Sequence, residues 1–163
     1  MPNWVTNKLY VVGPAQDIAE FKAKSRDSYF PANEKKDNRR VTKKRSKPVV
    51  VDLSFDRMVP IPLEVIKKPE IKLKDGFYEH PTLSWCIKHW GCKWDASNPK
   101  LIRESKRRLY YIFYTPWNPP YEWLKRVSKQ YPRLHFSVHY WDSAPRVIIW
   151  AIKGELWGKR KKS

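Results

Sequence analysis

The 163-residue chain has no long run of apolar residues, only two cysteines and only five glycines. A membrane-spanning helix needs about 20 consecutive apolar residues, and no window approaches that length. The first residues, MPNWVTNKLYVVG, lack the basic segment and apolar core of a signal peptide. We therefore expect a soluble, unprocessed protein.

The scarcity of cysteine and glycine also limits the chemistry. Two cysteines make no disulfide framework, which indicates a reducing compartment such as the cytoplasm. Five glycines leave few places for a phosphate-binding loop, and neither a nucleophile elbow, an HExxH motif nor a pair of catalytic carboxylates is apparent. We expect no cofactor.

Positive charge is what the chain has in excess. It holds 34 Lys and Arg against 16 Asp and Glu, for a formal net charge of +18. Such an imbalance is typical of proteins that bind a polyanion, most often nucleic acid. An anionic membrane fits less well, because no basic amphipathic helix is long enough to lie on a bilayer.

The basic residues gather in three segments. They are an arm over 25–48, a stretch over 100–108 and a tail over 159–163. Their candidate phosphate contacts are Lys35, Lys36, Arg39, Arg40, Lys43, Lys44, Arg45 and Lys47; Lys100, Arg103, Lys106, Arg107 and Arg108; and Lys159, Arg160, Lys161 and Lys162. A merely solubilising arm is the alternative, although clustered like charges repel and need something to offset them.

Hydrophobic periodicity predicts alternating strands and helices. We expect a strand over 4–12, a helix over 15–24, a strand over 49–55 and a helix from Pro81 that ends at Gly91. An extended segment, a strand over 109–117, a helix over 120–131 begun by Asn118 and Pro119, and strands over 134–141 and 146–152 follow. This order predicts one α+β domain over 1–158: a mostly antiparallel sheet with helices packed on one face, and a basic loop insertion.

Five sequence blocks carry a family resemblance. MPNWVTNKLYVVGP, SFDRMVPIP, WCIKHWGCKWDA, YIFYTPWNPPYEWL and YPRLHFSVHYWD together resemble the YubB-type ferredoxin-like domain proteins of phages, plasmids and other bacterial mobile elements. The resemblance implies a ferredoxin-like fold in a bacterial host cell and no iron–sulfur cluster. It supplies no catalytic or binding residues, and Val5 stands where the family usually has cysteine. A nucleic-acid role is therefore argued from the charge of this chain.

Cys86, His89 and Cys92 resemble an incomplete metal site. A structural zinc ion needs four ligands, and His80 is the nearest candidate for the fourth. We predict that no metal binds, that Cys86 is a small buried apolar residue, and that Gly91 ends the helix.

The 134–141 strand places His135, Ser137, His139 and Trp141 on one face. Two histidines suggest a ribonuclease, but four strand positions span about 13 Å, too far to flank one phosphate. The same face also suggests a surface on which bases stack, together with aromatic residues drawn from Tyr110, Tyr111, Phe113 and Tyr114. That these aromatics belong to the core instead remains open.

Three functions follow as hypotheses. The first is a non-enzymatic protein of a phage or mobile element that binds nucleic acid, RNA or a ribonucleoprotein rather than duplex DNA. The second is a factor that binds a host protein complex, such as a defence or CRISPR effector or the ribosome, through Trp117, Trp141 and Trp150. The third is a metal-independent ribonuclease that uses His135 and His139.

Overall fold

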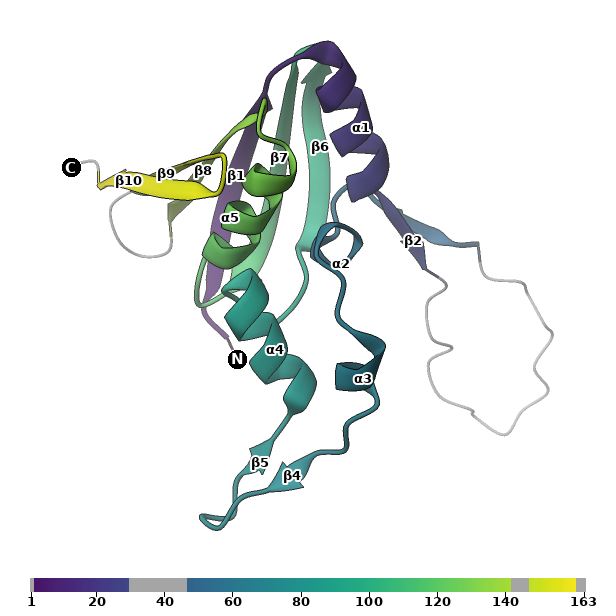
Figure 1. Ribbon diagram of the computed structural model, residues 1–163, viewed down its shortest axis with the longest axis vertical. Coiled ribbons are helices and arrows are strands. Elements are labelled where there is room, and N and C mark those ends of the chain that lie inside the picture. The colour runs from purple at the N-terminus through teal and green to yellow at the C-terminus, as the bar shows by residue number, and fades with distance from the viewer. Residues whose placement is uncertain (1, 30–46, 142–146, 161–163) are drawn as a thin grey trace.

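The computed structural model describes residues 2–29, 47–141 and 147–160. These residues form a main sheet of six antiparallel strands in the order β10-β9-β8-β1-β7-β6 (Figure 1). The strands are β1 (Trp4–Val12), β6 (Ser97–Ser105), β7 (Arg108–Pro116), β8 (His135–Trp141), β9 (Val147–Ile152) and β10 (Glu155–Arg160). β1 lies in the middle, paired with β7 on one side and β8 on the other.

Four adjacent strands, β8, β1, β7 and β6, and two helices make a ferredoxin-like core. Helix α1 (Ala15–Ser25) follows β1, and α5 (Tyr121–Gln130) connects β7 to β8. The strand order β8-β1-β7-β6 is that of two interleaved split β-α-β units. The predicted α+β class is therefore confirmed, with the hairpin β9–β10 added beyond β8 at one edge.

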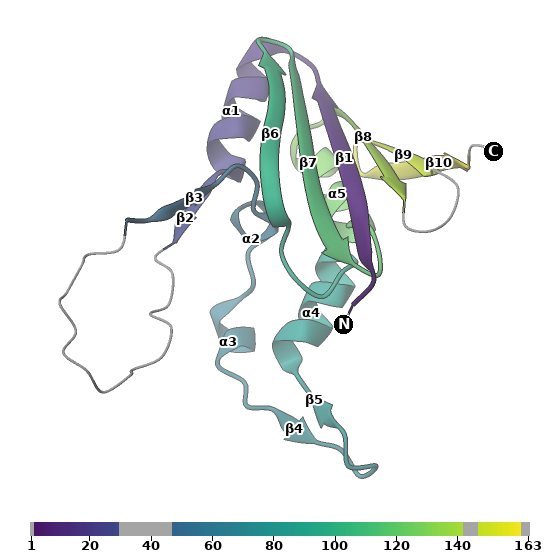
Figure 2. The same cartoon turned by 180° about the vertical axis from the view of Figure 1, so that it is seen from behind.

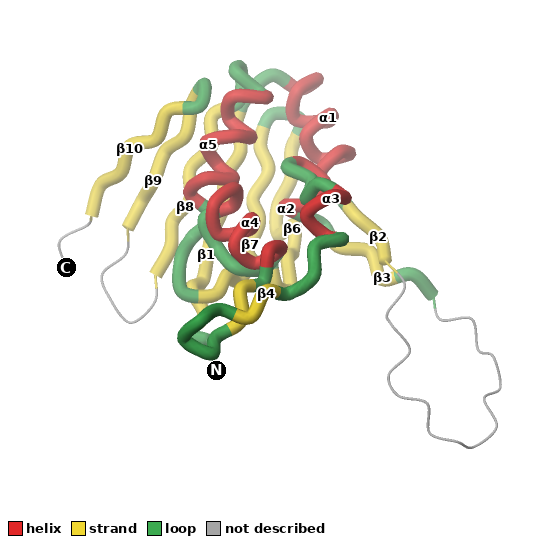
Figure 3. Tube along the Cα trace, turned by 60° about the horizontal axis from the view of Figure 1, so that its bottom comes forward, coloured by secondary structure: helices red, strands yellow, loops and turns green. Residues whose placement is uncertain are grey.

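The helices cover one face of the sheet. Seen from the end of the molecule in Figure 3, α1, α4 (Pro81–Trp90) and α5 lie on the same side of the strands. Phe21 of α1 and Trp123, Leu124 and Val127 of α5 are fully buried against alternate residues of the strands. The helix over 120–131 thus buries the residues that its 3.6-residue period predicts.

A long excursion separates α1 from β6. It contains β2 (Asp27–Tyr29), β3 (Val49–Val51), α2 (Phe55–Met58), α3 (Leu63–Ile66), β4 (Ile71–Lys72), β5 (Tyr78–Glu79) and α4. β2 pairs with β3 at the base of the predicted basic arm, and β4 pairs with β5 in a hairpin that projects away from the sheet in Figure 1. The predicted start of the basic arm at residue 25 is too early, since Ser25 belongs to α1 and residues 27–29 belong to β2.

Four predicted element boundaries are wrong. The strand over 49–55 stops at Val51, because Ser54 accepts a hydrogen bond from the backbone N–H of Arg57 and begins α2. The helix predicted from Asn118 begins at Tyr121, because Pro120 disfavours helical backbone at Pro119.

The other two errors concern the C-terminal segment and residues 100–108. The segment expected to be a tail from Lys159 continues β10 as far as Arg160. Residues 100–105 lie in β6, which begins at Ser97, rather than in a charged segment before a strand. Charged and polar residues at many positions of these two edge strands obscured the strand pattern in both places.

Candidate nucleic-acid interface

One face of the main sheet has no helix over it among the described elements. Figure 2 looks onto β6, β7, β1 and β8 directly, with α5 behind them. On β1, Val5, Asn7, Leu9 and Val11 are buried towards the helices, so the alternate residues face the other way. We call this second side the open face.

A stacked pair of tyrosines lies on the open face, near the end of β1 and the start of β7. Tyr10 of β1 and Tyr110 of β7 are cross-strand partners, and their ring centroids lie 4.6 Å apart with planes 5° from parallel. The ring of His139 lies 5.0 Å from that of Tyr10. We call Tyr10 and Tyr110 the tyrosine pair.

A hollow of about 460 Å³ lies beside the tyrosine pair. Tyr10, Tyr110, Arg103 and Arg108 line it, and Arg103 is the cross-strand partner of Tyr110. Glu104 also lines the hollow, but its carboxylate pairs with Lys22 of α1. We call this site the arginine hollow, which two arginines and two tyrosines line together.

This combination suits a nucleotide. Aromatic rings stack on bases of any sequence, and arginine donates paired hydrogen bonds to phosphate oxygens. A volume of a few hundred Å³ is also within the range of small-ligand sites. The hollow therefore offers the two contacts that a nucleotide needs within one cavity.

Elsewhere on the open face, the basic side chain of Lys8 lies over the aromatic ring of Trp141. The Lys8 ammonium lies 5.0 Å from the centre of the Trp141 ring. Lys100 of β6 pairs with Ile112 in the same register as Lys8. Glu155 of β10, which pairs with Ile152, is a carboxylate that the strands place on this side.

The two histidines lie on the open face but are not brought together. His135 pairs with Val12 and His139 with Lys8, at opposite halves of β8. The interval of four strand positions is retained, about 13 Å at the usual strand rise. This geometry does not place both imidazoles on one phosphate, and the ribonuclease hypothesis stays an untested prediction.

The predicted basic residues of 100–108 divide between two sides of the sheet. Arg103 and Arg108 line the arginine hollow on the open face. Lys106 instead lines a hollow between α1 and β6, and Arg107 donates a hydrogen bond from Nε to the Gly13 carbonyl at 3.4 Å. Only part of the predicted cluster therefore reaches the tyrosine pair.

Most of the other predicted phosphate contacts lie outside the described residues. These are Lys35, Lys36, Arg39, Arg40, Lys43, Lys44, Arg45, Lys161 and Lys162. Lys47 is exposed just before β3, and the backbones of Lys159 and Arg160 belong to β10. Their part in binding remains a prediction.

Several residues of the open face were missed from sequence, and two predicted ones lie elsewhere. Tyr111 and Phe113 are fully buried in the core, while Tyr110 and Tyr114 face outward. Tyr10 was treated only as a strand former. The tyrosine pair would be found by aligning the alternation of 4–12 with that of 109–117, which needs the strand register.

The WCIKHWGCKWDA block has a structural role. Gly91 has φ 87° and ends α4, and Trp90 donates a hydrogen bond from Nε1 to the Val59 carbonyl at 3.0 Å. Its ring also packs against Phe55 in an edge-to-face contact, with centroids 5.8 Å apart. Two blocks of the family resemblance, SFDRMVPIP and WCIKHWGCKWDA, therefore pack on each other.

The two cysteines are buried and unpaired. Cys86 and Cys92 are each 2% exposed, which confirms the predicted burial of Cys86. Burial raises the pKa of each thiol to about 12. Cys86 and Trp90 form the buried face of α4, whereas Ile87 is exposed.

No metal site is visible in the described ranges, where His, Cys, Asp and Glu side chains nowhere gather in a group of three around a possible ion. His80 pairs with Glu70, at 2.8 Å from Nδ1 to Oε1. Within the same ranges, none of the helices has the length and apolar character needed to cross a bilayer.

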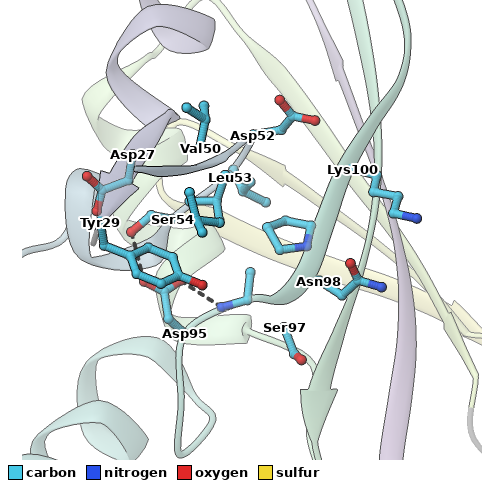
Figure 4. Close-up of a pocket in the computed structure, with 14 residues that line it drawn as sticks. Asp27, Tyr29, Val50, Asp52, Leu53, Ser54, Asp95, Ser97, Asn98 and Lys100 are labelled. Atoms are coloured by element: carbon cyan, nitrogen blue, oxygen red, sulfur yellow. Dashed lines mark hydrogen bonds between the residues drawn. The ribbon is translucent and has the colours of Figure 1, made fainter. Parts of the chain in front are cut away.

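A larger pocket of about 690 Å³ lies where β3 meets the start of β6 (Figure 4). Asp95 lies at its wall and accepts hydrogen bonds from Ser54 Oγ at 2.8 Å and from the backbone N–H groups of Phe55 and Ala96 at 2.5 and 2.6 Å. Burial raises the pKa of Asp95, and these donors offset part of that shift. Its contacts hold the start of α2 in place, so we regard this acidic pocket as structural.

Comparison with known proteins supports the fold. Residues 89–147, from the end of α4 through β8, match the family model described as "Ferredoxin-like domain in Api92-like protein". The chain resembles the crystal structure of protein Api92 from Yersinia pseudotuberculosis with a TM-score of 0.67 and 10% sequence identity, over 100% of this chain and 99% of that chain. No curated protein matches the chain in sequence.

These comparisons refine the family resemblance. The ferredoxin-like part is confirmed, while the YubB-type assignment and the mobile-element origin stay predictions. The matched stretch contains β6, β7, α5 and β8, the second half of the core. The chain has a ferredoxin-like fold and, over residues 89–147, is similar to the ferredoxin-like domain of Api92-like proteins.

Proposed function

We propose that the protein binds single-stranded nucleic acid, RNA or a ribonucleoprotein rather than duplex DNA, without catalysing a reaction. The observation that carries the proposal is the tyrosine pair together with the two arginines that line the same hollow. Stacking on these rings requires bases whose faces are free, and a duplex stacks its bases on one another.

Charge supports the same proposal. The chain has a formal net charge of +18, and Lys8, Lys100, Arg103 and Arg108 lie on the open face. Phosphate contacts of this kind give affinity that falls with salt and carries little sequence preference. The basic residues of 35–47 and 159–162 would add to this attraction.

The setting of the proposed activity follows from the family resemblance and the thiols. Two free cysteines suit a reducing cytoplasm. The blocks shared with YubB-type proteins favour a phage or other mobile element in a bacterial host.

The test is direct binding of fluorescein-labelled single-stranded RNA, single-stranded DNA and duplex DNA, measured by anisotropy at low salt. Tyr110→Thr, which removes a ring but keeps a strand-forming residue, should weaken binding by about 5-fold to 100-fold, the size of one base stacking on an aromatic ring. Tyr78→Thr on β5, 55% exposed and away from the open face, is the matched control. Undetectable binding to all three probes, or equal binding by both variants, contradicts the proposal.

A second candidate is binding to a host protein complex. The three tryptophans first suggested for it are spread out: Trp141 and Trp150 lie on the open face, whereas Trp117 follows β7 with Lys93 over its ring at 4.3 Å. The β4–β5 hairpin favours this function better, because Phe77 and Tyr78 are 71% and 55% exposed there. Capture of a partner that survives nuclease and is lost with Phe77→Ser would support it; loss with nuclease would not.

A further inference from the structure

The pairings of the main sheet align one row of open-face residues across all six of its strands. Arg103 pairs with Tyr110, Tyr110 with Tyr10, and Tyr10 with Ser137. Ser137 in turn pairs with Trp150, and Trp150 with Trp157. We call this series the cross-sheet row.

The hairpin β9–β10 extends the row beyond the ferredoxin-like core. Ile149 and Ala151 of β9 are buried towards α5, so Trp150 between them is on the open face. Its partner Trp157 on β10 is 48% exposed. The hairpin therefore continues the line of aromatic residues that begins at the tyrosine pair.

Packing alone does not account for these residues. An antiparallel sheet with one solvated face usually places polar residues on that face, and exposed edge strands usually avoid large apolar side chains. The cross-sheet row instead places four large aromatic residues on the open face: Tyr110, Tyr10, Trp150 and Trp157. Trp157 lies on the edge strand β10. The pattern matches a surface on which successive bases stack.

We propose that a single strand of nucleic acid crosses the β-strands along the cross-sheet row, from the arginine hollow to Trp157. This inference rests on the proposed function and adds to it the path and the length of the bound strand. Five gaps between neighbouring strands of about 4.8 Å give a path of about 24 Å. At about 3.4 Å per nucleotide of a stacked strand, that path holds at most about seven nucleotides.

The competing path runs along β1. It would lead from Tyr10 past Lys8 and Thr6 to Trp4, whose ring lies 6.1 Å from that of Trp94. Trp4 is 45% exposed, almost the same as Trp157. The two tryptophans therefore make a matched pair, since both lie on strands of the same sheet and only one belongs to the row.

The experiment measures the affinity of labelled oligouridylates of increasing length, from about three to about twelve nucleotides, for the wild type, Trp157→Thr and Trp4→Thr. We expect wild-type affinity to rise with length and to level off at about seven nucleotides or fewer. Trp157→Thr should match the wild type on the shortest oligonucleotides and lose about 5-fold or more on the long ones. Trp4→Thr should follow the wild type at every length, and Trp157→Tyr, which keeps a ring on β10, should recover most of the loss.

The outcomes separate the two proposals. A length-dependent loss in Trp4→Thr instead of Trp157→Thr overturns the cross-sheet path, as does a Trp157→Thr loss that is equal at all lengths or absent at all lengths. Failure of the wild type to bind any oligonucleotide overturns the proposed function itself. That result would be visible before any variant is compared.

Discussion

Removing the two guanidinium groups of the arginine hollow should change the salt dependence of binding. The perturbation is Arg103→Gln with Arg108→Gln, which keeps long polar side chains beside Tyr10 and Tyr110 and removes two charges. Each phosphate contact contributes about 0.7 to the slope of log affinity against log salt for a single strand, so the slope should become shallower by about 1.4.

The consequence can be worked out for an ordinary titration. Between 50 and 200 mM salt, a slope difference of about 1.4 shrinks the affinity ratio of wild type to variant by about 7-fold. The assay is anisotropy with a labelled oligouridylate at several salt concentrations. The control is Arg126→Gln together with Lys125→Gln on α5, which makes the same charge change on exposed residues of the covered side.

Equal slopes of log affinity against log salt for the wild type and the hollow variant would refute the proposed phosphate contacts. If the hollow variant has the wild-type slope, its arginines do not contact phosphate, whatever happens to affinity. If the α5 control changes the slope equally, the effect is one of overall charge. Only a shallower slope confined to the hollow variant supports a phosphate contact there.

Three further predictions concern stability and the reactivity of the buried thiols. Gly91→Ala should lower the free energy of unfolding by about 1–2 kcal/mol or more, because φ is 87° at this position and an added Cβ would lie 3.0 Å from the Tyr121 nitrogen. The measurement is a urea titration, and an unchanged unfolding midpoint would contradict the prediction. Asp95→Ala should cost about 2–4 kcal/mol by leaving the Ser54 hydroxyl and two backbone N–H groups without their acceptor, with Asp95→Asn costing less. Cys86 and Cys92 should resist a thiol reagent at pH 8 until the protein is unfolded. Since their folded pKa of about 12 exceeds the unfolded value, the stability they provide should be present below about pH 9 and lost as pH rises towards 12; rapid native labelling or a flat alkaline profile would count against this.

The core was predictable because its pattern is local. The alternation of 134–141 and the helical period of 120–131 each fix a buried face. Phe136 and Val138 of the strand and Trp123, Leu124 and Val127 of the helix are buried there, while Tyr140 is only partly buried. Gly91 was found by the same kind of local rule, since a helix that ends in left-handed backbone favours glycine.

The open-face site depends on information that is not local. The position of Tyr10 opposite Tyr110 follows from the register of two strands that are far apart in the chain. Charge counting found Arg103 and Arg108 together with Lys106 and Arg107, but it did not show that the first two alone line the hollow. The strand β10 was missed because a short edge strand that ends in Lys159 and Arg160 resembles a charged tail.

The tyrosine pair also has a consequence for how the protein folds. Residues 10 and 110 are 100 positions apart, and β1 has both of its neighbours, β7 and β8, in the last third of the described chain. At a synthesis rate of about 5–20 residues per second, β1 waits about 5–20 s for its first partner. Such long-range pairing makes folding slow, so the central strand is exposed for longest and the tyrosine pair is complete only when nearly the whole core has formed.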